Sequence, residues 1–250
     1  MSERAARVRL LGLDFTNLDV TAAAALIARQ DPAASFRYVV TPNADHLVRL
    51  GRHPELAPMY DGAWLRLLDS RVVARTARAL GLGAPCVAPG SDVTALLLAA
   101  HLRPHDRVTI IGLRPNHLAA LVQRYRLGAV AHHDPPMGFA DDPVAFQAAI
   151  AFVVAHPARF VFLAVGSPRQ ERLAAAIAAT GRACGVGLCI GASLEFLSGA
   201  MVRAPAWMQR SGLEWLHRMA SDPRRLGWRY LVDDPAVFGL LLRQRRNRKS

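Results

Sequence analysis

Short runs rich in Val, Ile, Leu and Phe alternate along the chain with longer segments that are rich in alanine and leucine. The short runs predict buried strands, and they are Val8–Leu11, Arg37–Val40, Leu65–Leu68, Val108–Ile111, Ala129–His132, Phe160–Val165 and Ala183–Ile190. Each run is followed by a turn and a segment of helical character, which is typical of parallel strands joined by crossover helices. The pattern predicts an α/β fold with a Rossmann-like, mostly parallel sheet and helices on both faces.

Several predicted helices begin with a residue that can cap a helix, followed by proline, which is favoured at the first helical position. These pairs are Thr41-Pro42, Asp142-Pro143, Ser167-Pro168, Asp222-Pro223 and Asp234-Pro235. After Gly199 the pattern changes to short predicted helices separated by Gly212, Pro223 and Pro235. We therefore expect an α/β catalytic domain over residues 1–200 and a basic helical appendage over residues 201–250.

Composition narrows the class of protein. The chain has 250 residues, of which 52% are hydrophobic and 20% charged, as in a globular protein with a sizeable core. Its three cysteines, Cys86, Cys184 and Cys189, contain no CxxC pair, so neither a disulfide framework nor a zinc site is expected. The N-terminus lacks a signal-peptide core, and no uncharged apolar run reaches roughly 18 residues. We expect a protein of the reducing cytoplasm with no membrane-spanning segment.

Charge is concentrated near the C-terminus. The 31 Lys and Arg residues exceed the 19 Asp and Glu residues by 12, and residues 201–250 hold eleven of the basic residues but only four of the acidic ones. Such a cluster can face nucleic acid, an anionic membrane or a substrate that carries phosphate. Arg225 and Arg229 stand four residues apart on a predicted helix, so they share a face that suits phosphate oxygens. Arg218 has a structural alternative, a helix salt bridge with Glu214.

The last predicted helix, from Pro235 onward, combines apolar and basic residues. Val237, Phe238 and Leu240 to Leu242 are followed by five basic residues between Arg243 and Lys249. At about 1 kcal/mol for each basic group near an anionic leaflet, these residues could contribute roughly 5 kcal/mol to binding at a membrane surface. Two alternatives remain open: a non-catalytic nucleic-acid-binding protein that uses the same charge, although no recognised nucleic-acid motif is present, and a peripheral membrane scaffold.

Polar residues follow four of the predicted strands. Parallel α/β sheets bind ligands beyond the carboxyl ends of their strands, so these residues are the candidates for a site. They are Thr41 and Asn43 after the second run, Asp69 after the third, Ser167 and Gln170 after the sixth, and Glu195 after the seventh. The structural alternative for Thr41, Ser167 and the Asp69-Ser70 pair is helix capping.

Common cofactor motifs are missing from the sequence. Gly185-x-Gly187-x-x-x-Gly191 departs from the dinucleotide-binding spacing by one residue, and neither a Walker loop nor HExxH occurs. His132 and His133 are adjacent on an extended segment, so their side chains point to opposite faces. We therefore expect no metal site.

The ordered set of these motifs resembles the WecG/TagA/CpsF family of bacterial glycosyltransferases, glycosyltransferase family 26. The resemblance covers most of the chain. It is carried by Thr41-Pro42-Asn43 with His46, Asp69, Gly90-Ser91-Asp92, Gly166-Ser167-Pro168-Arg169-Gln170-Glu171, Gly199-x-x-x-Arg203-Ala204-Pro205-x-Trp207-Met208-Gln209, Gly212-Leu213-Glu214-Trp215-Leu216-x-Arg218, Pro223-x-Arg225 and Arg229-Tyr230-Leu231. The chain departs from the family pattern in having Ser70 where glycine is usual and Glu195 where aspartate is usual.

The resemblance implies an inverting transfer of a sugar from a UDP-sugar to a polyprenyl-diphosphate-linked sugar, without a metal or other cofactor. The product would belong to a cell-envelope polysaccharide of the exopolysaccharide, teichoic acid or enterobacterial-common-antigen type. The enzyme would work as a peripheral protein on the cytoplasmic face of the bacterial inner membrane. Neither the sugar transferred nor the presence of a homo-oligomer follows from the sequence.

The resemblance also implies roles for individual residues. Asp69 would be the general base, with Thr41 and Asn43 lining the catalytic site. The substrate-binding residues would be Ser167, Gln170 for the donor, Glu195 near the nucleotide, and Arg218, Arg225 and Arg229 over the diphosphate.

Overall fold

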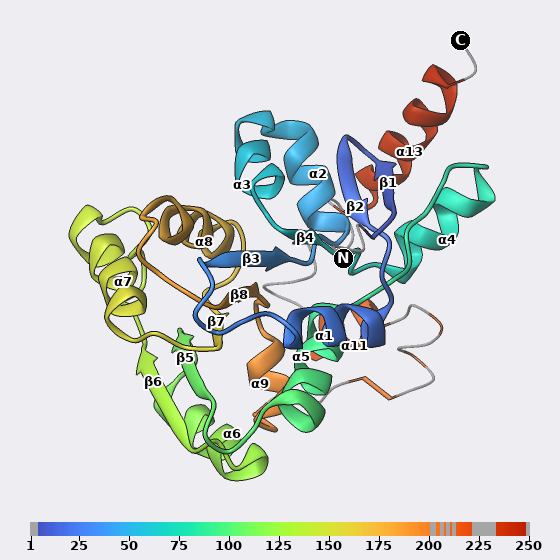
Figure 1. The fold of residues 1–250 in the computed structure, drawn as a ribbon. Helices are drawn as coiled ribbons and strands as arrows, with labels where there is room; N and C mark the ends of the chain where they lie inside the picture. The colour runs from blue at the N-terminus through green and yellow to red at the C-terminus, as the bar shows by residue number, and fades with distance from the viewer. Residues whose placement is uncertain are drawn as a thin grey trace.

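The fold is described from a computed structural model, which covers residues 5–200, 204–205, 208, 211, 214–221 and 234–248 (Figure 1). Its centre is a six-stranded sheet in which all neighbouring strands are parallel. The strand order is β4 (Leu65–Arg66), β3 (Arg37–Val40), β8 (Val186–Cys189), β7 (Phe160–Leu163), β5 (Arg107–Ile111) and β6 (Ala129–His133). The predicted α/β class with a parallel sheet is confirmed.

Helices cover both faces of this sheet (Figure 1). One face packs against α2 (Ala44–Arg52), α3 (Ala57–Asp61), α4 (Arg71–Ala79), α7 (Pro143–Ala155) and α8 (Arg169–Ala179). The other packs against α1 (Val20–Ala28), α5 (Gly90–Leu96), η2 (Leu97–His101), α6 (Pro115–Tyr125) and α9 (Ser193–Leu197). Alternation along β7 shows how one strand serves both cores. Phe160 and Phe162 belong to one cluster, and Val161 and Leu163 belong to the other.

The first predicted strand does not belong to the sheet. Residues Arg7–Leu10 form β1, which pairs antiparallel with a strand that the sequence pattern missed, β2 (Leu13–Thr16). The turn between them is two residues long, and both Leu11 (φ 49°) and Gly12 (φ 85°) have positive φ. Such a turn matches the twist of a hairpin, so the chain folds back at once instead of entering a helix.

The hairpin is fastened beside the edge strand β4 by Arg66. This arginine is only 4% exposed, and its Nε donates to the carbonyl of Asp14 in β2 at 2.7 Å. Its Nη1 donates to the carbonyls of Tyr60 and Asp61, each at 2.9 Å. A charged side chain in the predicted strand Leu65–Leu68 is thus buried because backbone carbonyls surround it.

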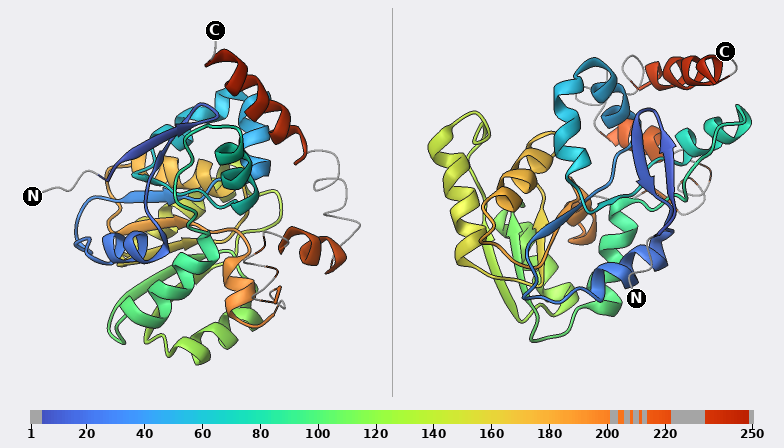
Figure 2. Two further views of the ribbon diagram at one scale, coloured as in Figure 1. Left: turned by 90° about the vertical axis from the view of Figure 1, so that its right-hand side faces the viewer. Right: turned by 45° about the horizontal axis from the view of Figure 1, so that its top comes forward.

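The C-terminal helix α13 (Ala236–Asn247) packs against α2 and α4 (Figure 2). Val237 and Leu241 are buried in the contact, and Gln244 Oε1 accepts a hydrogen bond from the Leu11 backbone at 2.8 Å. A shorter helix, α11 (Glu214–Ser221), precedes it. None of the helices within the described ranges is long and apolar enough to cross a membrane.

Candidate functional site

The sheet order brings the predicted site residues together. The strands that precede Asp69, Thr41, Glu195 and Gln170 are β4, β3, β8 and β7, which are consecutive neighbours in the sheet. Their carboxyl ends therefore share one stretch of one edge, where parallel α/β sheets bind ligands. The segments after β5 and β6 lie beyond this stretch, and they carry none of the predicted residues.

Thr41 and Asp69 meet at Gly90, the first residue of α5. Asp69 Oδ2 accepts a hydrogen bond from the Gly90 backbone N–H at 3.2 Å. The Thr41 hydroxyl donates to the carbonyl of Cys189, at the end of β8, at 3.3 Å. A Cβ atom at position 90 would lie only 2.7 Å from Thr41 Oγ1. Glycine is therefore required here for the hydroxyl of one strand end and the carboxylate of the next to pack against the same backbone.

Neither Thr41 nor Asp69 caps the helix that follows it, although the predicted alternative of capping by the Asp69-Ser70 pair is confirmed for Ser70. Asn43, not Thr41, caps α2, and its side chain accepts from the His46 backbone. Ser70 caps α4 by accepting from Val73, so the Asp69 side chain is not the cap of that helix. The predicted cap at Ser167 is also wrong, because α8 begins at Arg169 after Pro168. Capping of α2 by Thr41 and of α4 by Asp69 is therefore excluded, and both side chains instead contact segments distant in the chain.

Of the other predicted cap-and-proline pairs that the structure describes, one is confirmed and one is wrong. Asp142 caps α7 as predicted, since its Oδ1 accepts from Val144 and Ala145. Asp234 is not the cap of α13, which begins at Ala236 after Pro235. Asp222-Pro223 lies outside the described residues.

A buried polar network joins the ends of β3, β7 and β8. Asn43 Oδ1 lies 2.6 Å from His46 Nδ1, and His46 Nε2 lies 3.6 Å from Glu171 Oε1. The Gln170 side chain donates to the same Glu171 oxygen at 2.8 Å and accepts from the Gly191 backbone at 2.8 Å. His46, Gln170 and Glu171 are 8%, 3% and 1% exposed. Two of the predicted site amides, Asn43 and Gln170, are therefore linked through a histidine and a carboxylate for which the sequence suggested no role.

The ionisation of Glu171 is set by opposing effects. Burial alone would raise the pKa of this carboxyl group. The hydrogen bond and charge of His46, together with the Gln170 amide, outweigh burial and lower the pKa below its ordinary value. A sequence signal existed for His46, because Asn43 stands three residues before it, the spacing at which an N-cap side chain accepts from a backbone N–H of the first helical turn, as Asn43 does here.

Ser167 and Glu195 differ in their surroundings. Ser167 Oγ accepts from Arg49 Nη1 at 2.9 Å, and Arg49 Nη2 is held by Asp45 Oδ2 at 2.6 Å. Glu195 stands in the first turn of α9 and is partly exposed. Glu195 is thus more accessible than Glu171, whose side chain is 1% exposed.

The predicted diphosphate-binding arginines fall at the limits of the described structure. Arg225 and Arg229 lie outside the described residues. The backbone of Arg218 is part of α11, but its side chain lies outside them, as does that of Glu214. The assignment of these three arginines stays a prediction.

The histidines set aside as metal ligands have separate partners. His132 Nε2 lies 2.8 Å from the carbonyl of Leu113, and the His133 ring stacks on Phe152 with centroids 5.2 Å apart. Within the part of the chain that the structure describes, no group of three or more His, Cys, Asp or Glu side chains is placed to hold a metal ion.

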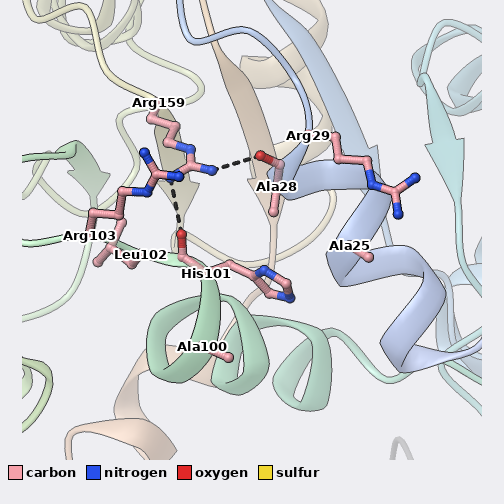
Figure 3. A pocket seen from close by; sticks show the side chains of 8 residues that line it. All are labelled: Ala25, Ala28, Arg29, Ala100, His101, Leu102, Arg103 and Arg159. Carbon is pink, nitrogen blue, oxygen red and sulfur yellow. Dashed lines mark hydrogen bonds between the residues drawn. The ribbon is translucent and has the colours of Figure 1, made fainter.

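A separate pocket of about 340 Å³ lies near the amino end of β7, away from the carboxyl ends of the strands. It is lined by the ends of α1 and η2 and by the residue before β7 (Figure 3). Arg159 fills one side of it, donating to the carbonyls of Ala28 at 2.7 Å and His101 at 3.0 Å. These carbonyls belong to helix ends, which need donors. Arg159 thus has a structural role, and the pocket contains none of the predicted site residues.

Comparison with known protein families gives a match that spans nearly the whole chain. The family is described as the glycosyl transferase WecG/TagA/CpsF family, and the match runs over residues 8–250.

Proposed function

The chain belongs to the WecG/TagA/CpsF family of glycosyl transferases, and from this premise we propose that it is an inverting enzyme that moves a sugar from a UDP-sugar to a polyprenyl-diphosphate-linked sugar. Glycosyltransferases of this family type act in the synthesis of cell-envelope polysaccharides. The observation that carries the proposal is the meeting of Thr41 and Asp69 at Gly90, beside the ends of four neighbouring strands.

Asp69 is the proposed general base. In an inverting transfer, the acceptor hydroxyl oxygen attacks the anomeric carbon from the face opposite UDP, and the bond from that carbon to UDP breaks. The hydroxyl proton passes to one carboxylate, so a single well-placed base is sufficient. The Gly90 N–H holds one oxygen of Asp69 in place. Thr41, on the other side of Gly90, is proposed to position the substrate beside this carboxylate.

The departing UDP gains negative charge, which fixed cations can stabilise. We assign this role to Arg218, Arg225 and Arg229, because guanidinium groups match the oxygens of a diphosphate. Ser167, Gln170 and Glu195 are proposed to contact the donor. Gln170 lies at this edge of the sheet, where its amide fastens the Gly191 turn at the end of β8.

Helix α13 is proposed to hold the enzyme on the cytoplasmic face of the bacterial inner membrane. Its buried Val237 and Leu241 attach it to the protein, while Phe238 and Leu242, one turn apart, are 40% and 45% exposed. Arg243 and Arg246 follow in the exposed part of the same helix. Exposed apolar side chains beside arginines fit the interface of an anionic leaflet.

The catalytic proposal is tested with Asp69→Asn. UDP release is measured with a panel of UDP-sugars and a short-chain lipid-diphosphate sugar as acceptor. The variant should bind UDP normally but lose transfer, because the amide cannot accept the hydroxyl proton. Asp141→Asn is the matched control, since the Asp141 side chain is 93% exposed. Near-normal turnover of Asp69→Asn would show that the base is another group.

The membrane proposal is tested by co-sedimentation with vesicles that contain anionic phospholipid. Phe238→Ser combined with Leu242→Ser should weaken binding. Val144→Ser, which changes an apolar side chain that is 78% exposed on α7, should leave binding unchanged. Equal binding of the double variant and the unchanged protein would exclude this face of α13 as the contact.

A further inference from the structure

His46 lies between two groups that can only accept hydrogen bonds. On one side is Asn43 Oδ1, which also accepts from the His46 backbone N–H at 3.3 Å and is thereby identified as the amide oxygen. Because it is 2.6 Å from His46 Nδ1, that ring nitrogen must carry a proton. The Asn43 backbone N–H also lies 3.4 Å from Nδ1 and could donate to it only if that nitrogen were unprotonated; the much shorter contact with the acceptor Oδ1 favours the protonated form.

On the other side is Glu171, whose carboxylate is almost fully buried. Its Oε1 faces His46 Nε2 at 3.6 Å, and its Oε2 has no hydrogen-bond partner among the described residues. A buried carboxylate needs a compensating charge. With protons on both ring nitrogens, His46 is the cation that supplies it: one N–H donates to Asn43 Oδ1 and the other faces Glu171 Oε1.

Other titratable groups around this pair do not supply the charge. Tyr60 of α3 meets the His46 ring edge-on, with centroids 6.4 Å apart, and burial raises the pKa of its hydroxyl above the ordinary value. Burial likewise raises the pKa of Tyr38 on β3 to about 12 and that of the Cys189 thiol on β8. Arg49 of α2 is engaged by Asp45 and Ser167.

We propose that His46 and Glu171 form a buried ion pair that sets the orientation of both site amides, Asn43 and Gln170. The imidazolium holds Asn43 Oδ1, which leaves the Asn43 amide N–H groups as the end offered to an oxygen atom of the substrate. Glu171 holds Gln170 Nε2, which turns Gln170 Oε1 to the backbone of Gly191. His46 and Glu171 are positioning residues, and their effect on turnover rests on the proposed transferase function.

The protonation of His46 is tested without any substrate. In protein labelled with ¹⁵N-histidine, the His46 ring, assigned from its loss in His46→Gln, should show protons on both nitrogens at neutral pH. Glu171→Gln should convert it to a neutral ring with one proton. A neutral His46 ring in the unchanged protein would overturn the proposal. This measurement stands even if no UDP-sugar proves to be a donor, so failure of the ion pair and failure of the proposed function are distinguishable.

Measurements of turnover and stability together then distinguish a positioning role of His46 and Glu171 from a role in folding. Each single variant, His46→Gln or Glu171→Gln, should lower kcat/KM by roughly 10- to 100-fold, the scale expected for a small misplacement of reacting groups. Stability should fall most in His46→Gln, which leaves a buried charge unpaired. The double variant removes both charges, so it should regain stability while turnover stays low. Recovery of both stability and turnover in the double variant would refute the positioning role.

The chain contains a matched control pair. His53 and Glu55 make the same type of contact, at 3.0 Å, but their side chains are 57% and 66% exposed. Glu55→Gln should therefore leave the His46 spectrum and turnover unchanged. A loss of turnover comparable with that of Glu171→Gln would mean that removal of any nearby carboxylate has this effect, which would also overturn the proposal.

Discussion

Replacement of Gly90 by alanine is expected to disturb the packing of Thr41 and Asp69 against this residue directly. The added Cβ would lie 2.7 Å from Oγ1, 3.3 Å from Cγ2 and 3.4 Å from Cβ of Thr41, so rotation of the hydroxyl alone cannot relieve the overlap. Either Thr41 moves and its hydrogen bond to Cys189 breaks, or α5 shifts and the hydrogen bond between Gly90 and Asp69 lengthens. Both responses displace a group of the proposed catalytic site.

The size of the effect follows from these distances. Overpacking costs about 1–3 kcal/mol of folding free energy, and the better helix propensity of alanine returns about 0.5–1 kcal/mol. The net loss should be about 0–2.5 kcal/mol, which leaves the protein folded. Displacement of catalytic groups by a fraction of an ångström should nevertheless lower kcat/KM by up to roughly 100-fold.

Urea unfolding gives the stability of Gly90→Ala, and UDP release gives its turnover. Gly51→Ala in α2 is the control, because its Cβ would meet Leu240 Cδ1 at 3.4 Å, an ordinary contact. That variant should gain about 0.5–1 kcal/mol and keep full turnover. If Gly90→Ala were as stable and as active as the unchanged protein, the close packing of Thr41 on Gly90 would not matter to the site, and the reasoning would fail.

Three further outcomes are expected. Gly185→Ala combines a positive φ of 80° with a Cβ only 2.0 Å from the Ala158 carbonyl oxygen, so urea unfolding should show a loss of about 3 kcal/mol or more. A thiol reagent should modify exposed Cys86 in the native protein but buried Cys189 only after unfolding, as peptide mapping by mass spectrometry would show; burial raises the pKa of the Cys189 thiol. Because the folded-state pKa of Glu171 is lowered, its contribution to stability is present above the ordinary carboxyl range and is lost as the pH falls through the folded-state value. Urea unfolding against pH should therefore be less acid-sensitive in Glu171→Gln than in the unchanged protein, and equal acid sensitivity would contradict the assigned shift.

Local patterns were sufficient for most of the fold. The strand at Arg37–Val40 was predicted with its observed bounds, and the cap at Asp142 was predicted correctly. These features depend on residues within one or two turns of each other. The hairpin of β1 and β2 was missed because its turn, Leu11-Gly12, lacks the usual Asn-Gly or Asp-Gly signature and the apolar run of β2 is short.

Long-range packing decided which residues could act together. Thr41 and Cys189 are 148 positions apart in the chain, and Arg49 and Ser167 are 118 apart. Whether Thr41 and Ser167 cap helices or serve the site was open in the sequence, because a hydroxyl before proline is compatible with both roles. Only the structure showed that neither residue caps a helix, because Asn43 caps α2 and Pro168 precedes α8.

The sequence by itself determined the α/β class, the polar residues at the strand ends and the resemblance to the glycosyltransferase family, because periodicity and motifs are properties of neighbouring residues. Only the tertiary structure decided that β4, β3, β8 and β7 are adjacent, that Thr41 and Asp69 both approach Gly90, and that the buried Glu171 faces His46. Strand order and burial depend on how segments that are distant in the chain pack against one another and exclude water. The local pattern of residues contains no information about that packing.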